Sequence, residues 1–162
     1  MAWVSTGAAV WAAVWWAVVG GGEAYSSLSV AVACDTMLPG HLSLGPQSSS
    51  APYGIYITPR NSSYYVTVYG HNQQEFKGFL LQAKDEQGQR AGHFTKVQIP
   101  GRIISCTFDG GAVQHKGGDP KTQITVQWEP RDYRGHVQFG ATIVQSYSTY
   151  WTNVLSDVLT VL

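Results

Sequence analysis

Charged residues are scarce in this chain of 162 residues, since Lys, Arg, Asp and Glu together make up 12% of it. The ten basic and ten acidic residues balance to a formal net charge of zero at pH 7. A general nucleic-acid-binding protein carries a basic excess, so this balance argues against that class. A low charge content together with many Tyr, Thr, Val, Gly and Ser residues favours an all-β domain over a helical one.

Hydrophobic runs long enough to cross a membrane are also missing. The most apolar stretch covers residues 8–19. It is about as long as the hydrophobic region of a signal peptide and shorter than the ~20 residues of a membrane span. Gly22 and Ala24 are small residues at the positions that a cleavage site before Tyr25 needs. We therefore expect a signal peptide at residues 1–24 and a secreted, extracellular domain at residues 25–162, with a short membrane anchor as the alternative.

Cysteine is rare as well, because only Cys34 and Cys106 are present. Neither has a CxxC partner, so a zinc site is not indicated. Two cysteines in an oxidising compartment leave no free thiol if they pair, and we expect a Cys34–Cys106 disulfide. The sequon Asn61-Ser62-Ser63 follows Pro59 in a turn-like stretch, which predicts glycosylation of Asn61 in a secreted protein.

Motifs for catalysis, metal binding and cofactor binding are not found. The sequence contains no GxSxG, HExxH or GxxxxGK[ST] pattern. The five histidines are His41, His71, His93, His115 and His136. They lie in or beside predicted turns and far apart in sequence, so we predict neither a metal site nor a catalytic site. Asp85 and Glu86 are expected to lie in an exposed, solvated turn. The chain is predicted to be non-enzymatic and without a cofactor.

Alternating apolar residues are what the sequence has in abundance. Residues 55–58, 65–69, 104–108, 124–128 and 137–143 each place their apolar side chains on one face. A period of two predicts strands with one buried face. Turn-forming stretches such as "DEQGQ", "DGG", "KGGDPK" and "EPRDYRG" separate these segments, which indicates a β-sandwich or barrel. No segment after residue 24 shows a helical period, and residues 35–52 are expected to form an irregular lead-in.

The stretch "EFKGFLLQAKDEQGQRAGHF" at residues 75–94 is ambiguous between a helix and two strands. Phe79, Leu81 and Ala83 share one face in an extended conformation, and Gly78 would weaken a helix by roughly 1 kcal/mol. We predict two strands around the "DEQGQ" turn. Trp128 ends another alternating set just before Pro130, where a strand must stop, and its ring is predicted to be buried.

Several of these segments also resemble a known family. "ACDTMLPGH", "PQSSSAPYGIYI", "FKGFLLQAKD" and "VQWEPRDYRGHVQFGATIV" are similar, in order, to the reelin amino-terminal, or reeler, domain. The resemblance covers residues 33–162, and the combination of "FxGFLLQA" with "WxP…GxVxFxATxV" is its most specific part. It implies an immunoglobulin-like β-sandwich of about seven to nine antiparallel strands. Family domains often have a second disulfide, for which this chain has no cysteines.

Reeler domains occur in large matrix proteins, in haem-bearing membrane reductases and in small secreted defence proteins. The single-domain organisation predicted here is similar to the third group. The resemblance therefore implies an innate-immune module that binds microbial envelope polymers such as lipopolysaccharide, lipoteichoic acid or peptidoglycan. The alternative is an extracellular-matrix or signalling module that binds a protein or a glycosaminoglycan. His41 and His115 occupy positions where relatives often have His, which suggests structural hydrogen bonds.

Microbial polyanions require a local concentration of basic side chains on a nearly neutral protein. The predicted ligand-binding residues are Lys116, Lys121, Arg131, Tyr133 and Arg134, in the loops "HKGGDPK" and "PRDYRG". Arginine can hold a phosphate with two parallel hydrogen bonds, and a tyrosine ring can lie against a sugar. The competing interpretation is that the basic residues are spread evenly and protect strand edges. Tyr56, Tyr65 and Tyr69 are an alternative contact surface.

Overall fold

The structure is a computed structural model that describes residues 27–40 and 45–162. The expected signal peptide and His41 lie outside the described residues. In chain order the elements are α1 (Ser27–Thr36), β1 (Tyr53–Arg60), β2 (Ser63–Gly70), the 3-10 helix η1 (His71–Gln73), β3 (Gly78–Asp85), β4 (His93–Val97), β5 (Gly101–Cys106), β6 (Phe108–His115), β7 (Gln123–Glu129), β8 (Gly135–Ser146) and β9 (Thr149–Val161).

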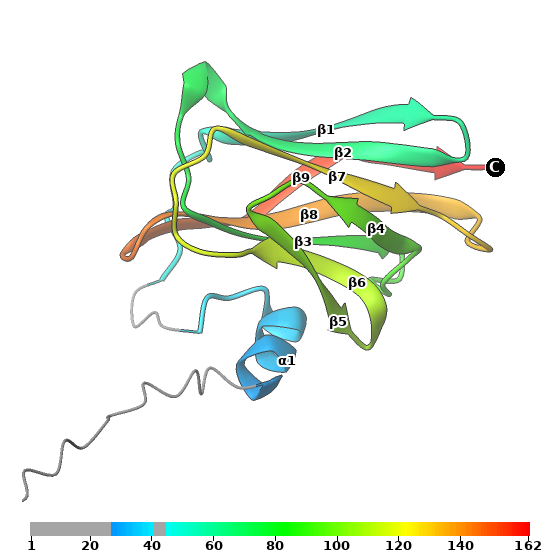
Figure 1. Cartoon of the computed structure of the whole chain (residues 1–162), viewed down its shortest axis with the longest axis horizontal. Helices are drawn as coiled ribbons and strands as arrows, with labels where there is room; N and C mark the ends of the chain where they lie inside the picture. The colour runs from blue at the N-terminus through cyan, green and yellow to red at the C-terminus, as the bar shows by residue number, and fades with distance from the viewer. Residues whose placement is uncertain (1–26, 41–44) are drawn as a thin grey trace, which may run out of the picture.

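The nine strands of the described residues form two antiparallel sheets that pack face to face (Figure 1). One sheet has the order β1-β2-β7-β4 and the other the order β5-β6-β3-β8-β9. The 75–94 stretch forms β3, a turn and the start of β4, as predicted. The expected all-β, immunoglobulin-like sandwich of antiparallel strands is therefore confirmed.

The core lies between the two sheets and is built from the apolar sets that the alternation predicts. Phe79, Leu81 and Ala83 of β3 are buried, and so are Ile124 and Val126 of β7. Trp128 is 0% exposed, which confirms its predicted burial. Its indole Nε1 donates a hydrogen bond to the Ala91 carbonyl at 3.0 Å, and its ring meets the Phe139 ring edge-on at a centroid distance of 5.3 Å.

The helix α1 corrects the expectation that no helix follows residue 24. Its sequence SLSVAVACDT does not separate apolar from polar residues with a helical period, so no amphipathic pattern signals a helix. Met37 ends the helix with a left-handed backbone (φ 57°), and its amide donates to the Ala33 carbonyl. The irregular lead-in thus begins after the helix and not at residue 35.

Contacts with the outer face of the five-stranded sheet hold α1 in place (Figure 1). Cys34 forms the expected disulfide with Cys106 of β5, with a Cα–Cα distance of 5.7 Å. The Cys34 carbonyl also accepts a hydrogen bond from Gln82 Nε2 at 2.7 Å and one from the Arg90 guanidinium at 2.8 Å. The same guanidinium forms an ion pair with Asp35 at 2.9 Å. A covalent bond and three polar contacts therefore replace the apolar face that α1 lacks.

The β5–β6 connection is a second correction. Ile104, Cys106 and Phe108 were expected on one strand with a turn at "DGG", but the turn falls at Thr107 (φ 77°) and Phe108 already belongs to β6. Gly110 and Gly111 lie inside that strand. A Cβ on Gly111 would come within 2.6 Å of the Cys106 carbonyl oxygen. These glycines permit a close backbone approach and do not form the turn.

Replacing Trp128 with Ala should lower the free energy of unfolding by about 3–5 kcal/mol, because the cavity would form at the centre of the core. Urea unfolding followed by circular dichroism measures the change. Val158→Ala, at an exposed position of β9, is the control and should change stability by no more than about 0.5 kcal/mol. Equal effects of the two substitutions would contradict the central role of Trp128.

Removing both cysteines (Cys34→Ala and Cys106→Ala) should cost about 4 kcal/mol by the chain-entropy model, because the bond joins residues 72 positions apart. The sandwich should remain folded while α1 detaches, since the core between the sheets is untouched. Chymotrypsin should then cut after Met37 faster than in the parent chain. Unchanged stability and unchanged protection at Met37 would show that the polar contacts of Cys34, Gln82 and Arg90 are sufficient alone.

Candidate functional site

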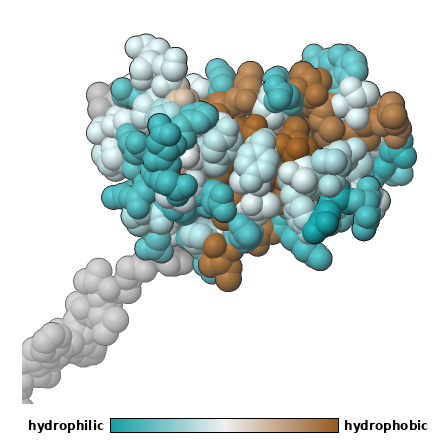
Figure 2. All heavy atoms as spheres, turned by 90° about the horizontal axis from the view of Figure 1, so that it is seen from above, coloured by the Kyte–Doolittle hydropathy of each residue, from teal (hydrophilic) through white to brown (hydrophobic). Residues whose placement is uncertain are grey.

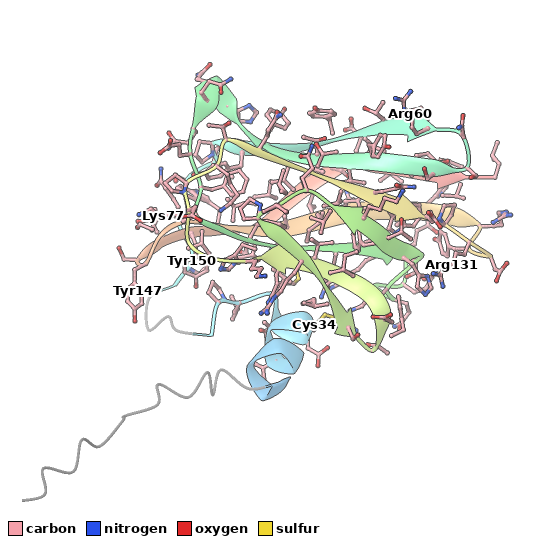
Figure 3. All side chains as sticks on the ribbon, in the orientation of Figure 1. Cys34, Arg60, Lys77, Arg131, Tyr147 and Tyr150 are labelled. Atoms are coloured by element: carbon pink, nitrogen blue, oxygen red, sulfur yellow. A yellow bond between two sulfur atoms is a disulfide. The ribbon has the colours of Figure 1, made fainter. Side chains whose placement is uncertain are left out.

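The five predicted ligand-binding residues lie at opposite ends of the sandwich. Lys116 and Lys121 precede β7, whereas Arg131, Tyr133 and Arg134 follow it. The seven residues of β7 span roughly 20 Å at about 3.3 Å per residue. In Figure 3, Lys77, whose carbonyl accepts from Lys121, and Arg131 are at opposite ends of the molecule. The structure therefore does not bring these five residues into one site.

The ammonium group of Lys121 forms hydrogen bonds within the protein. The residue is 9% exposed, and Nζ donates to the Lys77 carbonyl at 2.7 Å and to the Asp119 carbonyl at 2.6 Å. Burial lowers the pKa of Lys121, and nearby Asp119 acts in the opposite direction. Lys121 ties its loop to the start of β3, so it is poorly placed to bind a ligand. Lys116 of the same loop is exposed.

The loop after β7 keeps its two arginines at the surface. Arg134 donates to the carbonyls of Arg131 and Tyr133, both at 2.8 Å, and the Tyr133 hydroxyl donates to the His136 carbonyl. Burial and the nearby carboxylates of Asp85 and Glu86 raise the pKa of Tyr133. The loop is thus held by its own hydrogen bonds, with acidic neighbours.

Asn61 of the sequon lies beside these arginines. It occupies the β1–β2 turn with a left-handed backbone (φ 50°), a conformation that Asn tolerates well. Asn61, Arg131 and Arg134 line one shallow hollow of about 410 Å³. A glycan on Asn61 would therefore share this hollow with the arginine side chains, although both were predicted independently.

Charge is segregated along the length of the sandwich. One end holds the starts of β3, β5 and β7. Its basic residues are Lys77, Arg102, Lys116 and Lys121, and its acidic residues are Glu75 and Asp119. We call it the basic end. The opposite, acidic end has the basic residues Arg60, Lys84, Arg90, Arg131 and Arg134, and the acidic residues Asp35, Asp85, Glu86, Asp109, Glu129, Asp132 and Asp157. Lys96 lies near the middle.

A larger hollow, which we call the α1 pocket, opens at the basic end between the residues that end and follow α1 and the outer face of the five-stranded sheet. Its volume is about 530 Å³. Met37 and Leu38 line one side and Val144 the other, with Leu80 at the base between them. Lys77 and Arg102 were not among the predicted binding residues, because only the sheet order brings the starts of β3 and β5 to one place.

Two of the described histidines make specific polar contacts. His115 lies against the Phe79 backbone, with Nδ1 at 3.2 Å from the Phe79 amide nitrogen, so its expected structural role is supported. His136 pairs with Glu86 at 2.7 Å in an exposed position. Among residues 27–40 and 45–162, no group of three or more His, Cys, Asp or Glu side chains is arranged to hold a metal ion. Within the same ranges, no helix has the length and apolar character that a bilayer span requires.

The outward tyrosines form a loose row on the four-stranded sheet. The rings of Tyr56 and Tyr69 are 5.5 Å apart between centroids, and the Arg60 guanidinium lies 5.9 Å from the Tyr65 ring centre. The tyrosines are therefore partly covered by one another and by Arg60, which limits the flat surface that they offer to a sugar.

On the face seen from above, Figure 2 shows hydrophobic residues between hydrophilic ones, mostly toward the end where the chain terminates.

Comparison with known proteins shows the family to which this chain belongs. A family model described as the Reeler domain matches residues 32–162. The chain is 36% identical over 148 residues to defense protein 3 of Antheraea mylitta, with 86% of this chain and 88% of the relative covered. A defense protein of Drosophila melanogaster is 32% identical, with 84% and 89% covered. Ferric-chelate reductase 1 of Homo sapiens is 32% identical across 83% of this chain, which spans only 24% of the reductase.

The fold agrees with solved structures. The crystal structure of the Reelin-N domain of F-spondin matches with a TM-score of 0.59 and 22% sequence identity, covering 74% of this chain and 92% of that domain. The class defined by fold and topology is an antiparallel two-sheet β-sandwich with immunoglobulin-like packing. Within that class, the chain belongs to the reeler domain family.

The free energy of unfolding should decrease as the pH is lowered below 6.5, because of His93. Its half-buried ring packs on Phe108 at a centroid distance of 4.8 Å, and its Nδ1 has no partner among the described residues. Burial first, and Arg131 second, lower the pKa of His93, while Asp109 and Glu129 oppose the shift. As the pH falls below 6.5, the unfolded chain binds a proton that the folded chain does not, so stability is lost until the folded pKa is reached.

Melting temperatures at pH 7.5 and 5.5 test this effect. The parent chain should lose more stability between these values than His93→Gln, which has no ring to protonate. His71→Gln, at an exposed position, is the matched control and should behave like the parent. An identical loss in His93→Gln would show that other groups cause the acid sensitivity.

Proposed function

We propose that this chain is a secreted, non-enzymatic defence module that binds anionic polymers of microbial surfaces. The observation that carries the proposal is the 36% identity to a defense protein along nearly the full length of both chains. The absence of catalytic motifs in the sequence is consistent with a binding role. The reductase relative shares only its reeler part with this chain, so its activity does not transfer.

The basic end is the surface that we propose for the polymer. Lys77, Arg102 and Lys116 are exposed there, and the described part of the chain places two acidic side chains at the same end. Arg131 and Arg134 are also exposed, but Glu129 and Asp132 lie in or beside their loop. Because exposed charges interact over about 8–10 Å at physiological salt, those carboxylates weaken the attraction of the arginine pair for an anion. The Arg131–Tyr133–Arg134 loop is therefore the second candidate.

A pull-down on whole bacteria, lipopolysaccharide, lipoteichoic acid, peptidoglycan and heparin beads tests the function. Binding to the microbial materials, weakened between about 50 and 500 mM salt, supports it. Binding to heparin alone favours the alternative, an extracellular-matrix module for glycosaminoglycan or protein. Binding to none of these materials would contradict the proposed function and the glycosaminoglycan version of the alternative.

Two double variants that each remove two positive charges locate the surface. Lys77→Gln with Lys116→Gln should reduce binding to lipopolysaccharide beads about tenfold or more, since each lost charged hydrogen bond costs about 1.5–3 kcal/mol. Arg131→Gln with Arg134→Gln should leave most binding intact, with an unchanged melting curve in both variants. The reverse result would assign the ligand to the arginine loop, and Asn61→Gln would then show whether a glycan there limits access.

A further inference from the structure

The α1 pocket has the size and the lining of a site for a small amphiphile. Its volume of about 530 Å³ lies within the ~300–1,000 Å³ typical of small-molecule sites. Met37 and Leu38 on one side and Val144 on the other are only partly covered by the protein, so an apolar surface is left inside a concave wall. Leu80 and Ala33 complete its apolar base.

The charged groups of the pocket are of one sign. Lys77 and Arg102 line it together with His115, and no Asp or Glu is among its described lining residues. The Lys77 backbone is held in place, because its carbonyl accepts from Lys121 and its amide donates to the Val144 carbonyl at 2.9 Å. The guanidinium of Arg102 lies against the amide oxygen of Gln114, once that amide is oriented to accept from it. Two cationic side chains therefore flank an apolar hollow, and none of the described lining residues supplies a carboxylate to pair with them.

We infer that the α1 pocket binds a single-chain anionic amphiphile. The acyl chain packs against Met37, Leu38 and Val144, and a phosphate or carboxylate head is held by Lys77 and Arg102. A plain sugar would leave the apolar walls unused, and a neutral lipid would leave the two cations unpaired. The inference rests on the proposed function only for the source of the ligand, which is then the lipid part of a microbial envelope polymer; a free fatty acid has the same chemistry.

Calorimetric titration with dodecyl phosphate, below its micelle concentration, is the test. The secreted chain should bind it with a Kd that rises about tenfold in Lys77→Gln, as one charge-assisted contact is lost. Decyl phosphate, two methylenes shorter, should bind about tenfold more weakly, because each buried methylene contributes about 0.8 kcal/mol. Dodecyl maltoside, which has the same chain and no charge, should bind at least about tenfold more weakly. Equal binding of all three probes would overturn the inference.

A pocket-filling pair of variants separates the site from general surface binding. Val144→Phe places a bulky aromatic ring in the pocket and should abolish dodecyl phosphate binding. Val158→Phe makes the same change at an exposed position of β9 and should have no effect. Unaltered binding by Val144→Phe, with a parent-like melting curve, would place the ligand elsewhere. If Val144→Phe does not fold, Leu38→Asp, at a position 44% exposed, tests the opposite wall.

The outcomes distinguish this inference from the proposed function. A chain that binds bacteria but not dodecyl phosphate overturns the inference and leaves the proposed function intact. A chain that binds dodecyl phosphate but no microbial material supports the pocket, with laurate as the probe for a fatty-acid source, and overturns the proposed function. Stronger binding of lipopolysaccharide than of its deacylated form, lost in Val144→Phe, supports the envelope lipid as the source.

Discussion

Burial of one apolar face from each sheet is the constraint on which the rest of the structure depends. Trp128 shows how complete this burial is, because its ring is fully enclosed and its one polar atom donates a hydrogen bond to the Ala91 carbonyl. Once every second residue of a strand is committed to this layer, the remaining ones face outward. Function is then confined to the outer faces and to the two ends, where loops meet and charge collects.

The strands of the sandwich were predictable because their signal is local. Period-two alternation and turn residues can be recognised within a few positions, and they located most strands and the buried Trp128. The helix α1 gave no such signal, since its sequence does not separate apolar from polar residues with a helical period. The glycines at 110 and 111 were misleading, because Gly marks both turns and close backbone contacts. Only the three-dimensional neighbours distinguish these two uses.

The candidate site was less predictable, because it depends on the order of strands in the sheets. The predicted ligand site combined the loops on either side of β7, yet the length of a strand separates its two ends. Lys77 and Arg102 are 25 positions apart and come together because β3 and β6 are neighbours and β5 pairs with β6. Lys121 resembled a free cation in sequence, but the structure uses it to bind two carbonyls. These are properties of the topology and not of any motif.

The attachment of α1 connects stability with the pocket. The polar contacts that hold α1 are incompletely satisfied, since Gln82 Oε1 and Arg90 Nε are buried and have no partner among the described residues. Such groups weaken a polar contact network, so the Cys34–Cys106 bond has a larger share in holding the helix than in holding the sheets. Because Met37 and Leu38 follow α1 directly, the disulfide also positions one wall of the α1 pocket. A covalent link formed in an oxidising compartment would then be a precondition for a binding surface as well as for stability. This explains how a nearly neutral chain can present one cationic, partly apolar end: the sandwich separates its charges along its length, and the disulfide places an apolar wall beside the positive ones.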